Sequence, residues 1–220
     1  MGMIGDLRRN ISRELSSLGF LPSTDGGYHN RNGDSGPEFL QATIAAGLYP
    51  NIASRRKGEA NFSTVTNRKA KVHISSVNAC KGQPLNGKCQ VGEGEVEFIV
   101  YGEMVRGVSS FTMNQTTHLT SPLPLILLCG NLRVRPADLE QNDIGNVVGK
   151  SVLSVDDWIL FLSSTEVASN LVVLRRRLNN AFWHLVANPA LGLSKLGSAE
   201  KDAVETLGLV LRSSHKAHAR

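Results

Sequence analysis

Hydrophobic residues recur with a helical period at the start of the chain. Their spacing of three or four residues places them on one face of an amphipathic helix, and Gly19 marks its end. The apolar positions are Ile4, Leu7, Ile11, Leu15 and Leu18. Residues 23–36 that follow are rich in Gly, Asp, Asn and Ser. Because this segment has almost nothing to bury, we expect a mobile loop.

The pattern then predicts a second helix followed by strands. Pro37 suits the first turn of this helix, and Gly47 suits its left-handed C-terminal cap. From Tyr49 to Leu162 the period changes to an alternation that favours β-branched and aromatic residues. Expected strands cover residues 51–56, 62–66, 95–101, 116–120 and 152–161, with loops at 82–94 and 135–149. Five short strands with a helical insertion are typical of an OB-fold barrel, although other small barrels share that count.

The last part of the chain is again helical in pattern. Ser163 and Glu166 have the spacing of a capping box, in which each side chain satisfies a backbone amide of the helix start. Apolar residues then continue at helical spacing until Pro189, and a final helix is expected over residues 199–211, followed by a frayed basic tail at 213–220. The fold class is therefore mainly β with flanking helices (α+β). We expect three segments: residues 1–36, an OB-fold domain at 37–189, and a C-terminal helix and tail at 190–220.

The distribution of charge along the chain suggests a kind of partner, because the positive charge is concentrated in one stretch. The formal net charge is +5 and the sequence pI is about 9.3. Residues 50–90 hold eight Lys and Arg against the single acid Glu59, whereas residues 91–130 hold four Glu and one Arg. A basic cluster of this kind is expected for a polyanionic partner such as nucleic acid, although many basic proteins do not bind nucleic acid.

Other composition features bear on the compartment. Cys80, Cys89 and Cys129 are an odd number of cysteines without metal-ligand spacing, which favours an intracellular reducing compartment over a disulfide framework. Nucleus, cytoplasm and mitochondrion are not distinguished. No apolar run approaches the ~20 residues that span a bilayer, so no membrane partner is expected. The start of the chain has no signal-peptide core, and we expect a fragment of a longer protein.

The motifs associated with catalysis fail on spacing or context. Residues 145–151 (GNVVGKS) resemble a phosphate-binding loop, but only three residues separate the glycines where such a loop needs four. There is no nucleophile elbow and no metal pair among the six histidines. Asp156 and Asp157 point to opposite faces if they lie in a strand. We therefore predict no catalytic residue and no metal site. The run 175–177 (RRR) fans around a helix, which favours a solvated flank with at most one arginine engaged.

Residues 68–78 are the most informative stretch. Arg68, Lys69 and Lys71 precede His73-Ile74-Ser75-Ser76-Val77-Asn78. Cations supply sequence-independent attraction to phosphates, while hydroxyl, amide and imidazole groups can contact sugars and bases. A polar turn with solvated lysines explains the same composition equally well.

Five motifs in this order resemble the C-terminal OB-fold region of DEAH-box RNA helicases, nearest to the RNA helicase A/maleless branch. They are residues 47–53 (GLYPNIA), 73–78 (HISSVN), 101–106 (YGEMVR), 120–128 (TSPLPLILL) and 155–159 (VDDWI). The resemblance covers roughly residues 36–189. It implies an RNA-binding module that contacts single-stranded RNA at the exit of the helicase channel and supports RNA and ribonucleoprotein remodelling. ATP and Mg²⁺ are then expected for the parent helicase, whose catalytic domains lie upstream, with no cofactor in this fragment.

The resemblance also assigns roles to residues. The segment matched by His73, Ser75, Ser76 and Asn78 is an RNA-facing loop in the family, although Ile74 stands where the family has a basic residue or proline. The full set of predicted RNA-binding residues is Arg55, Arg56, Lys57, Arg68, Lys69, Lys71, His73, Ser75, Ser76 and Asn78. The 120–128 and 155–159 motifs are expected to be structural. Expected partners are single-stranded RNA, the upstream helicase domains and, as a further candidate, a protein cofactor. The alternative function is a docking platform for such a cofactor, with RNA contact secondary.

Overall fold

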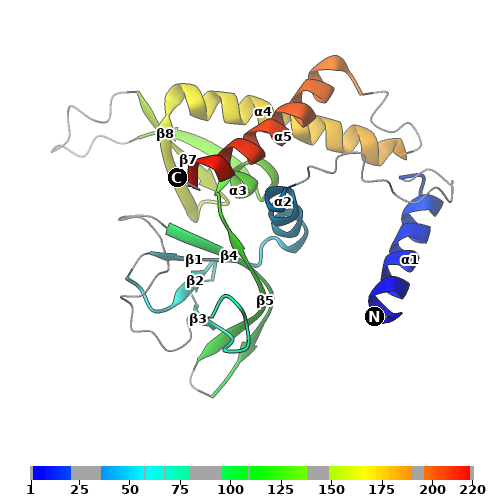
Figure 1. Cartoon of the computed structure of the whole chain (residues 1–220). Coiled ribbons are helices and arrows are strands. Elements are labelled where there is room, and N and C mark those ends of the chain that lie inside the picture. The colour runs from blue at the N-terminus through cyan, green and yellow to red at the C-terminus, as the bar shows by residue number, and fades with distance from the viewer. Residues whose placement is uncertain are drawn as a thin grey trace. The chain divides into compact units, whose positions relative to one another are not determined.

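The computed structural model of the protein describes residues 2–20, 36–56, 58–66, 68–79, 96–108, 110–137, 149–189 and 196–218 (Figure 1). The loop expected at 82–94 lies outside these residues, as do residues 23–35 of the loop expected at 23–36 and residues 138–148 of the loop expected at 135–149. Residues 135 and 136 were expected in that loop but lie in a strand, Leu132–Pro136. Backbone contacts divide the chain into two compact units, one of residues 1–34 and 173–209, the other of residues 35–172 and 210–220. The second unit contains both β-sheets.

Five strands of the second unit close into a barrel (Figure 1). They are β1 (Ile52–Arg56), β2 (Phe62–Thr64), β3 (Lys69–Val72), β4 (Val96–Arg106) and β5 (Phe111–Leu119). The order around the barrel is β1-β2-β3-β5-β4, with β3 and β5 parallel and the other neighbours antiparallel. A five-stranded barrel of this kind confirms the predicted OB fold.

The barrel interior follows from the two-residue period of its strands. In β3 the small Ala70 is buried, whereas Lys69 and Lys71 on either side of it are exposed. The buried interior residues are Ala53, Phe62, Ala70, Ile99, Tyr101 and Met113. Because a side chain on the opposite face cannot reach this core, the same alternation places the lysines of β3 on the outer surface.

The predicted set of strands was wrong in two places. Residues 152–161 were expected to form one barrel strand, but β7 (Lys150–Val155) and β8 (Ile159–Ser164) form a hairpin that pairs with β6 (Leu132–Pro136) in a separate antiparallel sheet. Asp156 and Asp157 have φ of 46° and 61°, and this left-handed pair turns the chain back. The remaining barrel strand is β3, which was missed because it has only two apolar residues, Ala70 and Val72.

A second core joins the barrel to the three-stranded sheet through two helices, α2 (Pro37–Leu48) and α3 (Leu123–Leu128). α2 contacts α3, β4 and β5, and α3 contacts β7 (Figure 1). Phe98 of β4 packs against Phe161 of β8 with ring centroids 5.7 Å apart. Gly47 does not cap α2 as predicted: the helix continues to Leu48, and the N–H of Tyr49 bonds to the Ala45 carbonyl.

Asp156 organises one edge of this second core. Its carboxylate accepts hydrogen bonds from the Tyr49 hydroxyl and from the backbone N–H of Asn131, the latter at 2.8 Å. Gly130, with φ of 50°, lies so close that an added Cβ would meet the Asp156 carboxylate and the Tyr49 oxygen. Burial, together with Asp156, raises the pKa of the Tyr49 hydroxyl well above its usual range. We call these four residues the Asp156 junction.

The helices begin and end close to where the pattern places them. α1 (Gly2–Ser17) is followed by Gly19 in the left-handed region, as predicted. α4 (Thr165–Ala187) begins one residue later than the capping box requires, because the Ser164 hydroxyl accepts the N–H of Val167 at 3.3 Å. α5 (Ser198–His218) extends into residues expected to fray. Of the helices described, none has the length and apolar character needed to cross a membrane.

Candidate nucleic-acid interface

The predicted RNA-facing segment forms a double turn, residues 73–78, that lies against β5. The N–H of His73 bonds to the Met113 carbonyl at 3.0 Å, which continues the parallel pairing of β3 with β5 by one residue. The N–H of Ser76 then bonds to the His73 carbonyl at 2.9 Å, and the N–H of Ala79 to the Ser76 carbonyl at 3.1 Å. These bonds give the 73–78 turn a defined backbone.

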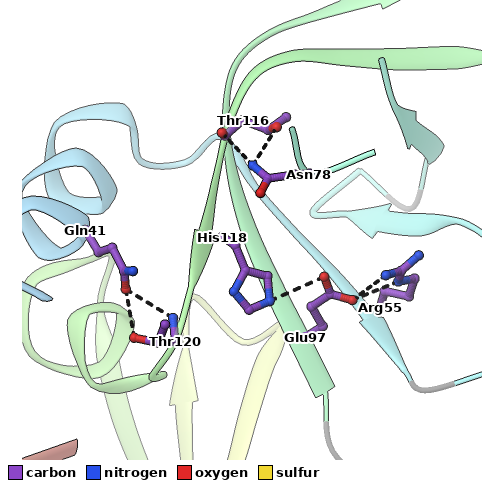
Figure 2. Close-up of polar contacts among 7 residues, drawn as sticks. All are labelled: Gln41, Arg55, Asn78, Glu97, Thr116, His118 and Thr120. Carbon is purple, nitrogen blue, oxygen red and sulfur yellow. Dashed lines mark hydrogen bonds and ion pairs between the residues drawn. The ribbon is translucent and has the colours of Figure 1, made fainter. Parts of the chain in front are cut away.

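Asn78 and Ser76 hold the turn on β5. Figure 2 shows the contact of Asn78 with Thr116. The Asn78 amide nitrogen donates to the Thr116 carbonyl at 2.8 Å and to the Thr116 hydroxyl at 3.1 Å, which uses both of its protons. The Ser76 hydroxyl lies 2.8 Å from the same Thr116 hydroxyl. Both residues therefore position the turn, and their side-chain hydroxyl and amide groups are engaged with Thr116.

His73 and Ser75 form the exposed side of the turn. The Nδ1 atom of His73 accepts the backbone N–H of Ser75 at 3.2 Å and lies 2.6 Å from the Ser75 hydroxyl. When the ring is neutral, this arrangement places its proton on Nε2, because Nδ1 already accepts a backbone proton. His73 thus presents an N–H donor from an oriented ring at the surface.

A groove of about 620 Å³ opens beside His73. Its lining is polar and uncharged apart from the histidine: Ser75, Ser76, Asn114, Gln115, Thr116 and Thr117. Gln115 lies in the left-handed region, with φ of 51°, opposite Gly102 of β4, where a Cβ would collide with the glutamine side chain. Neutral hydroxyl and amide groups of this kind can contact sugar hydroxyls and base edges, and the described lining residues add no Lys or Arg to attract a phosphate. We call it the turn groove.

Sequence reasoning missed the β5 side of the turn groove. Asn114 and Thr116 belong to a strand that begins at Phe111, whereas the predicted strand began at residue 116. The alternation of Phe111, Met113 and the following residues was the available signal. The distortion at Gln115 has no such signal, since glutamine is not a residue that favours positive φ.

Arg55 is already engaged within the barrel surface (Figure 2). Its Nε and Nη2 atoms donate to one Glu97 oxygen at 3.0 and 2.5 Å, and its guanidinium lies 4.4 Å from the centre of the Phe62 ring. His118 contacts the other Glu97 oxygen at 3.3 Å. Burial raises the pKa of Glu97, but hydrogen bonds from His118 and Arg55 outweigh it and hold the pKa below its usual range.

The other predicted cations occupy different places. Arg56 is exposed at the end of β1, and Lys57 lies outside the described residues. Arg68 lies over the Phe111 ring at 5.2 Å from its centre, and the Lys69 ammonium donates to the Ser63 hydroxyl at 2.7 Å. Lys71 is exposed two residues before His73. β3 thus brings Lys69, Lys71 and the 73–78 turn onto one side of the barrel, while Arg55 is held on β1 by Glu97.

The remaining candidate residues have structural surroundings. In the 175–177 run, Arg175 is buried while Arg176 and Arg177 are exposed, as expected for a solvated flank with one arginine engaged. Cys129 is buried in the second core. Within the part of the chain that the structure describes, no group of three His, Cys, Asp or Glu side chains could hold a metal ion.

Comparison with known proteins defines the class of this domain. Residues 40–132 match the family model described as an oligonucleotide/oligosaccharide-binding (OB)-fold, the domain that sits in the C-terminal region of DExH-box helicases. The match begins in α2 and ends at the start of β6, so it contains the whole barrel.

The relatives extend this similarity along most of the chain. The chain is 25% identical over 208 residues, 93% of its length, to the DExH-box ATP-dependent RNA helicase DExH1 of Arabidopsis thaliana. It is 24% identical over 189 residues to the ATP-dependent DNA/RNA helicase DHX36 of Mus musculus, and 27% identical over 162 residues to the ATP-dependent RNA helicase dhx29 of Xenopus laevis. The matched regions are 85% and 70% of this chain. They span only 18%, 17% and 10% of the three relatives. The family model assigns residues 40–132 to an OB fold.

Proposed function

We propose that this chain is the single-stranded RNA-binding OB module of an ATP-dependent DExH-box RNA helicase. Its 73–78 turn and turn groove contact RNA at the exit of the helicase channel. The observation that carries this proposal is the geometry of the turn. Ser76 and Asn78 fix it on Thr116, which leaves the oriented His73 ring and the Ser75 edge facing an open, uncharged polar groove.

The chemistry of the groove favours RNA over a purely electrostatic ligand. Hydroxyl and amide groups can bond to a ribose 2′-hydroxyl, which acts as donor and acceptor and distinguishes RNA from DNA. The neighbouring lysines of β3 add sequence-independent attraction to phosphates. Relatives whose names state RNA helicase activity support the same assignment, and remodelling of RNA and ribonucleoprotein would be the task of the parent protein.

ATP and Mg²⁺ belong to the parent helicase in this proposal. The role of this module is to hold and orient the strand while nucleotide hydrolysis takes place in other domains of the parent.

The test is fluorescence anisotropy of a labelled oligouridine of roughly 12 nucleotides, within the range of ~4–16 that one OB fold covers. The full chain is titrated alongside His73→Ala and the matched control His184→Ala, an exposed histidine on α4. We expect saturable binding that His73→Ala weakens about tenfold, equivalent to ~1.4 kcal/mol, while the control binds normally. Equal binding by all three proteins would remove the 73–78 turn from the interface.

The second candidate function, docking of a protein cofactor, is favoured by one separate observation. Phe182 and Trp183 form an edge-to-face pair on α4, with ring centroids 5.6 Å apart, and are 58% and 66% exposed. Adjacent exposed aromatic residues are typical of interaction hot spots. In this alternative, Trp183→Ala abolishes capture of a helicase cofactor and His73→Ala leaves it intact. If His73→Ala instead weakens RNA binding and Trp183→Ala leaves RNA binding unchanged, the first proposal is supported.

A further inference from the structure

We propose that a second hollow on the barrel is a phosphate-binding subsite for the RNA strand that enters the turn groove. This inference rests on the proposed function and adds to it a distinct location and ligand group. The hollow has a volume of about 470 Å³. Its lining residues include Asn61, Lys69, Lys71, Arg106, Ser110 and Phe111. We call it the cation hollow.

The topology of the barrel brings its three cations together from separate strands. Lys69 and Lys71 lie on the outer side of β3, on either side of the buried Ala70. Ala70 is paired with Phe111 of β5, and Phe111 is also paired with Arg106 at the end of β4. The β3–β5–β4 pairing brings the end of β4 within two strands of the lysines, and Lys69, Lys71 and Arg106 all line the cation hollow, although more than thirty residues separate Arg106 from the lysines in sequence.

Neither Lys71 nor Arg106 forms an ion pair with any described acid, and Lys69 contacts only the Ser63 hydroxyl. Arg55, by contrast, is bound to Glu97. An anion in the hollow would be attracted to all three cations that line it. The cation hollow thus carries positive charge that no described acid neutralises.

The other groups in the hollow favour a phosphate over a base. Asn61 offers an amide and Ser110 a hydroxyl, both of which bond readily to phosphate oxygens. Phe111 contributes the only aromatic ring among the lining residues, and the Arg68 guanidinium already lies over it. A base therefore finds no open stacking surface, whereas a phosphate finds cations and neutral donors.

The cation hollow and the turn groove lie next to each other along β3 and the residues that continue it. Lys71 and His73 are two residues apart on β3 and its continuation, a separation of roughly 6.6 Å in extended backbone. A single-stranded RNA that occupied both sites would place a phosphate among Lys69, Lys71 and Arg106. Its adjoining sugar or base would then lie beside His73. In this arrangement the cation hollow attracts the phosphate, and the turn groove contacts the sugar or base.

The test measures how RNA affinity depends on salt, using the same labelled oligouridine and the full chain. Binding is titrated from about 50 to about 200 mM salt for wild type, Lys71→Gln, Arg106→Gln and the control Arg135→Gln, an exposed arginine on β6. Each phosphate contact contributes about 0.7 to the slope of log affinity against log salt for single strands. We expect Lys71→Gln and Arg106→Gln each to reduce the slope by about 0.7. The difference in RNA affinity between each variant and wild type should therefore shrink roughly threefold between about 50 and about 200 mM salt.

The outcomes separate this inference from the proposed function. If His73→Ala weakens binding while Arg106→Gln and Lys71→Gln keep the wild-type slope, the cation hollow is not a phosphate site and the proposed function stands. If no variant differs from wild type, or wild type does not bind, both are wrong. Loss of binding to an oligoglutamate peptide in Arg106→Gln, with unchanged RNA slopes, would assign the hollow to an acidic protein segment instead.

Discussion

Two polar turns of this molecule, the 73–78 turn and the turn at residues 156–158, differ in where their side-chain hydrogen bonds go. At the Asp156 junction both carboxylate oxygens accept hydrogen bonds from within the fold, one from Tyr49 and one from Asn131. In the 73–78 turn, Asn78 and Ser76 bond inward to Thr116, but the His73 ring remains at the surface. A polar motif is therefore scaffold or interface according to where its hydrogen bonds go, which composition alone does not state.

The largest expected effect comes from breaking the Asp156 junction with Gly130→Ala. An alanine at this φ of 50° is strained, and its Cβ would displace the Tyr49 hydroxyl and the Asp156 carboxylate. We expect a loss of about 3 kcal/mol in the free energy of unfolding, from ~1–2 for the left-handed backbone and ~1–2 for weakened hydrogen bonds. Chemical denaturation measures this loss, with Gly58→Ala (φ of 89°, open space) as the control for strain alone. Equal losses in the two variants would show that the junction itself adds no stability.

The next largest effect concerns the Arg55–Glu97–His118 cluster. Glu97→Gln leaves the Arg55 guanidinium, whose side chain is 13% exposed, without its charge partner. We expect a loss of about 2 kcal/mol at neutral pH, below the full cost for a deeply buried pair because both side chains retain some solvent contact. Thermal unfolding of Glu97→Gln beside Glu103→Gln, an exposed carboxylate on β4, measures the difference.

The same cluster predicts a dependence on acid. Since the pKa of Glu97 in the fold is below its ordinary value of 4.5, the unfolded chain binds its proton first. Its contribution to stability is present above about pH 4.5 and is lost as pH falls through the lower pKa of the folded state. Glu97→Gln should remove part of this acid dependence, and an unchanged pH profile would contradict the assignment.

The third effect tests whether the inward bonds of the 73–78 turn serve the interface. Asn78→Ala removes both donors to Thr116, and we expect a stability loss of about 1–2 kcal/mol. RNA affinity should fall about tenfold as the turn loses its position on β5, equivalent to ~1.4 kcal/mol. Asn114→Ala, which removes a donor to Glu103 from the groove wall, is the matched control for altered groove chemistry. Unchanged RNA affinity in Asn78→Ala would mean that binding does not need the ordered turn.

A smaller effect appears at alkaline pH. The pKa of Tyr49 is raised in the fold, so the unfolded chain loses this proton first as pH rises past about 10. Stability from this group is present below pH ~10 and declines above it. We expect Tyr49→Phe to lose about 1 kcal/mol near neutrality and to unfold with a flatter profile between pH 9 and about 11. Parallel profiles for the variant and wild type would remove Tyr49 from this linkage.

How far the sequence predicts this molecule depends on the range of the interaction concerned. Amphipathic spacing located α1 and α4, because the helical period is a local property. It could not show that residues 152–161 belong to a second sheet, since alternation specifies a face and not a partner strand. The missing barrel strand, β3, has a pattern too short to stand out.

The same limit applies to the candidate site. The segment 73–78 was identified from its residue types and from the family resemblance, and local turns do form there. Thr116, which holds the turn, and Arg106, which completes the cation hollow, are brought near by the β3–β5–β4 pairing. Arg55 was grouped with Arg56 as an RNA contact, but Glu97 lies opposite it in the register of β1 with β4. Such cross-strand partners are distant in sequence, so local sequence patterns do not reveal them.

The smallest expected effect separates the two neighbouring arginines of β1. Arg56 is exposed and its side chain has no ion pair with a described acid, so Arg56→Gln should change the free energy of unfolding by less than about 0.5 kcal/mol. If a phosphate passes near the end of β1, RNA affinity falls by two- to threefold at low salt, and the slope against log salt decreases by about 0.7. Arg55→Gln should show the reverse: lower stability from the lost Glu97 contact, and a salt slope equal to that of wild type. Paired denaturation and anisotropy titrations on both variants measure this contrast. A reduced salt slope in Arg55→Gln would mean that RNA binding releases this arginine from Glu97, and the ion pair would then compete with the ligand.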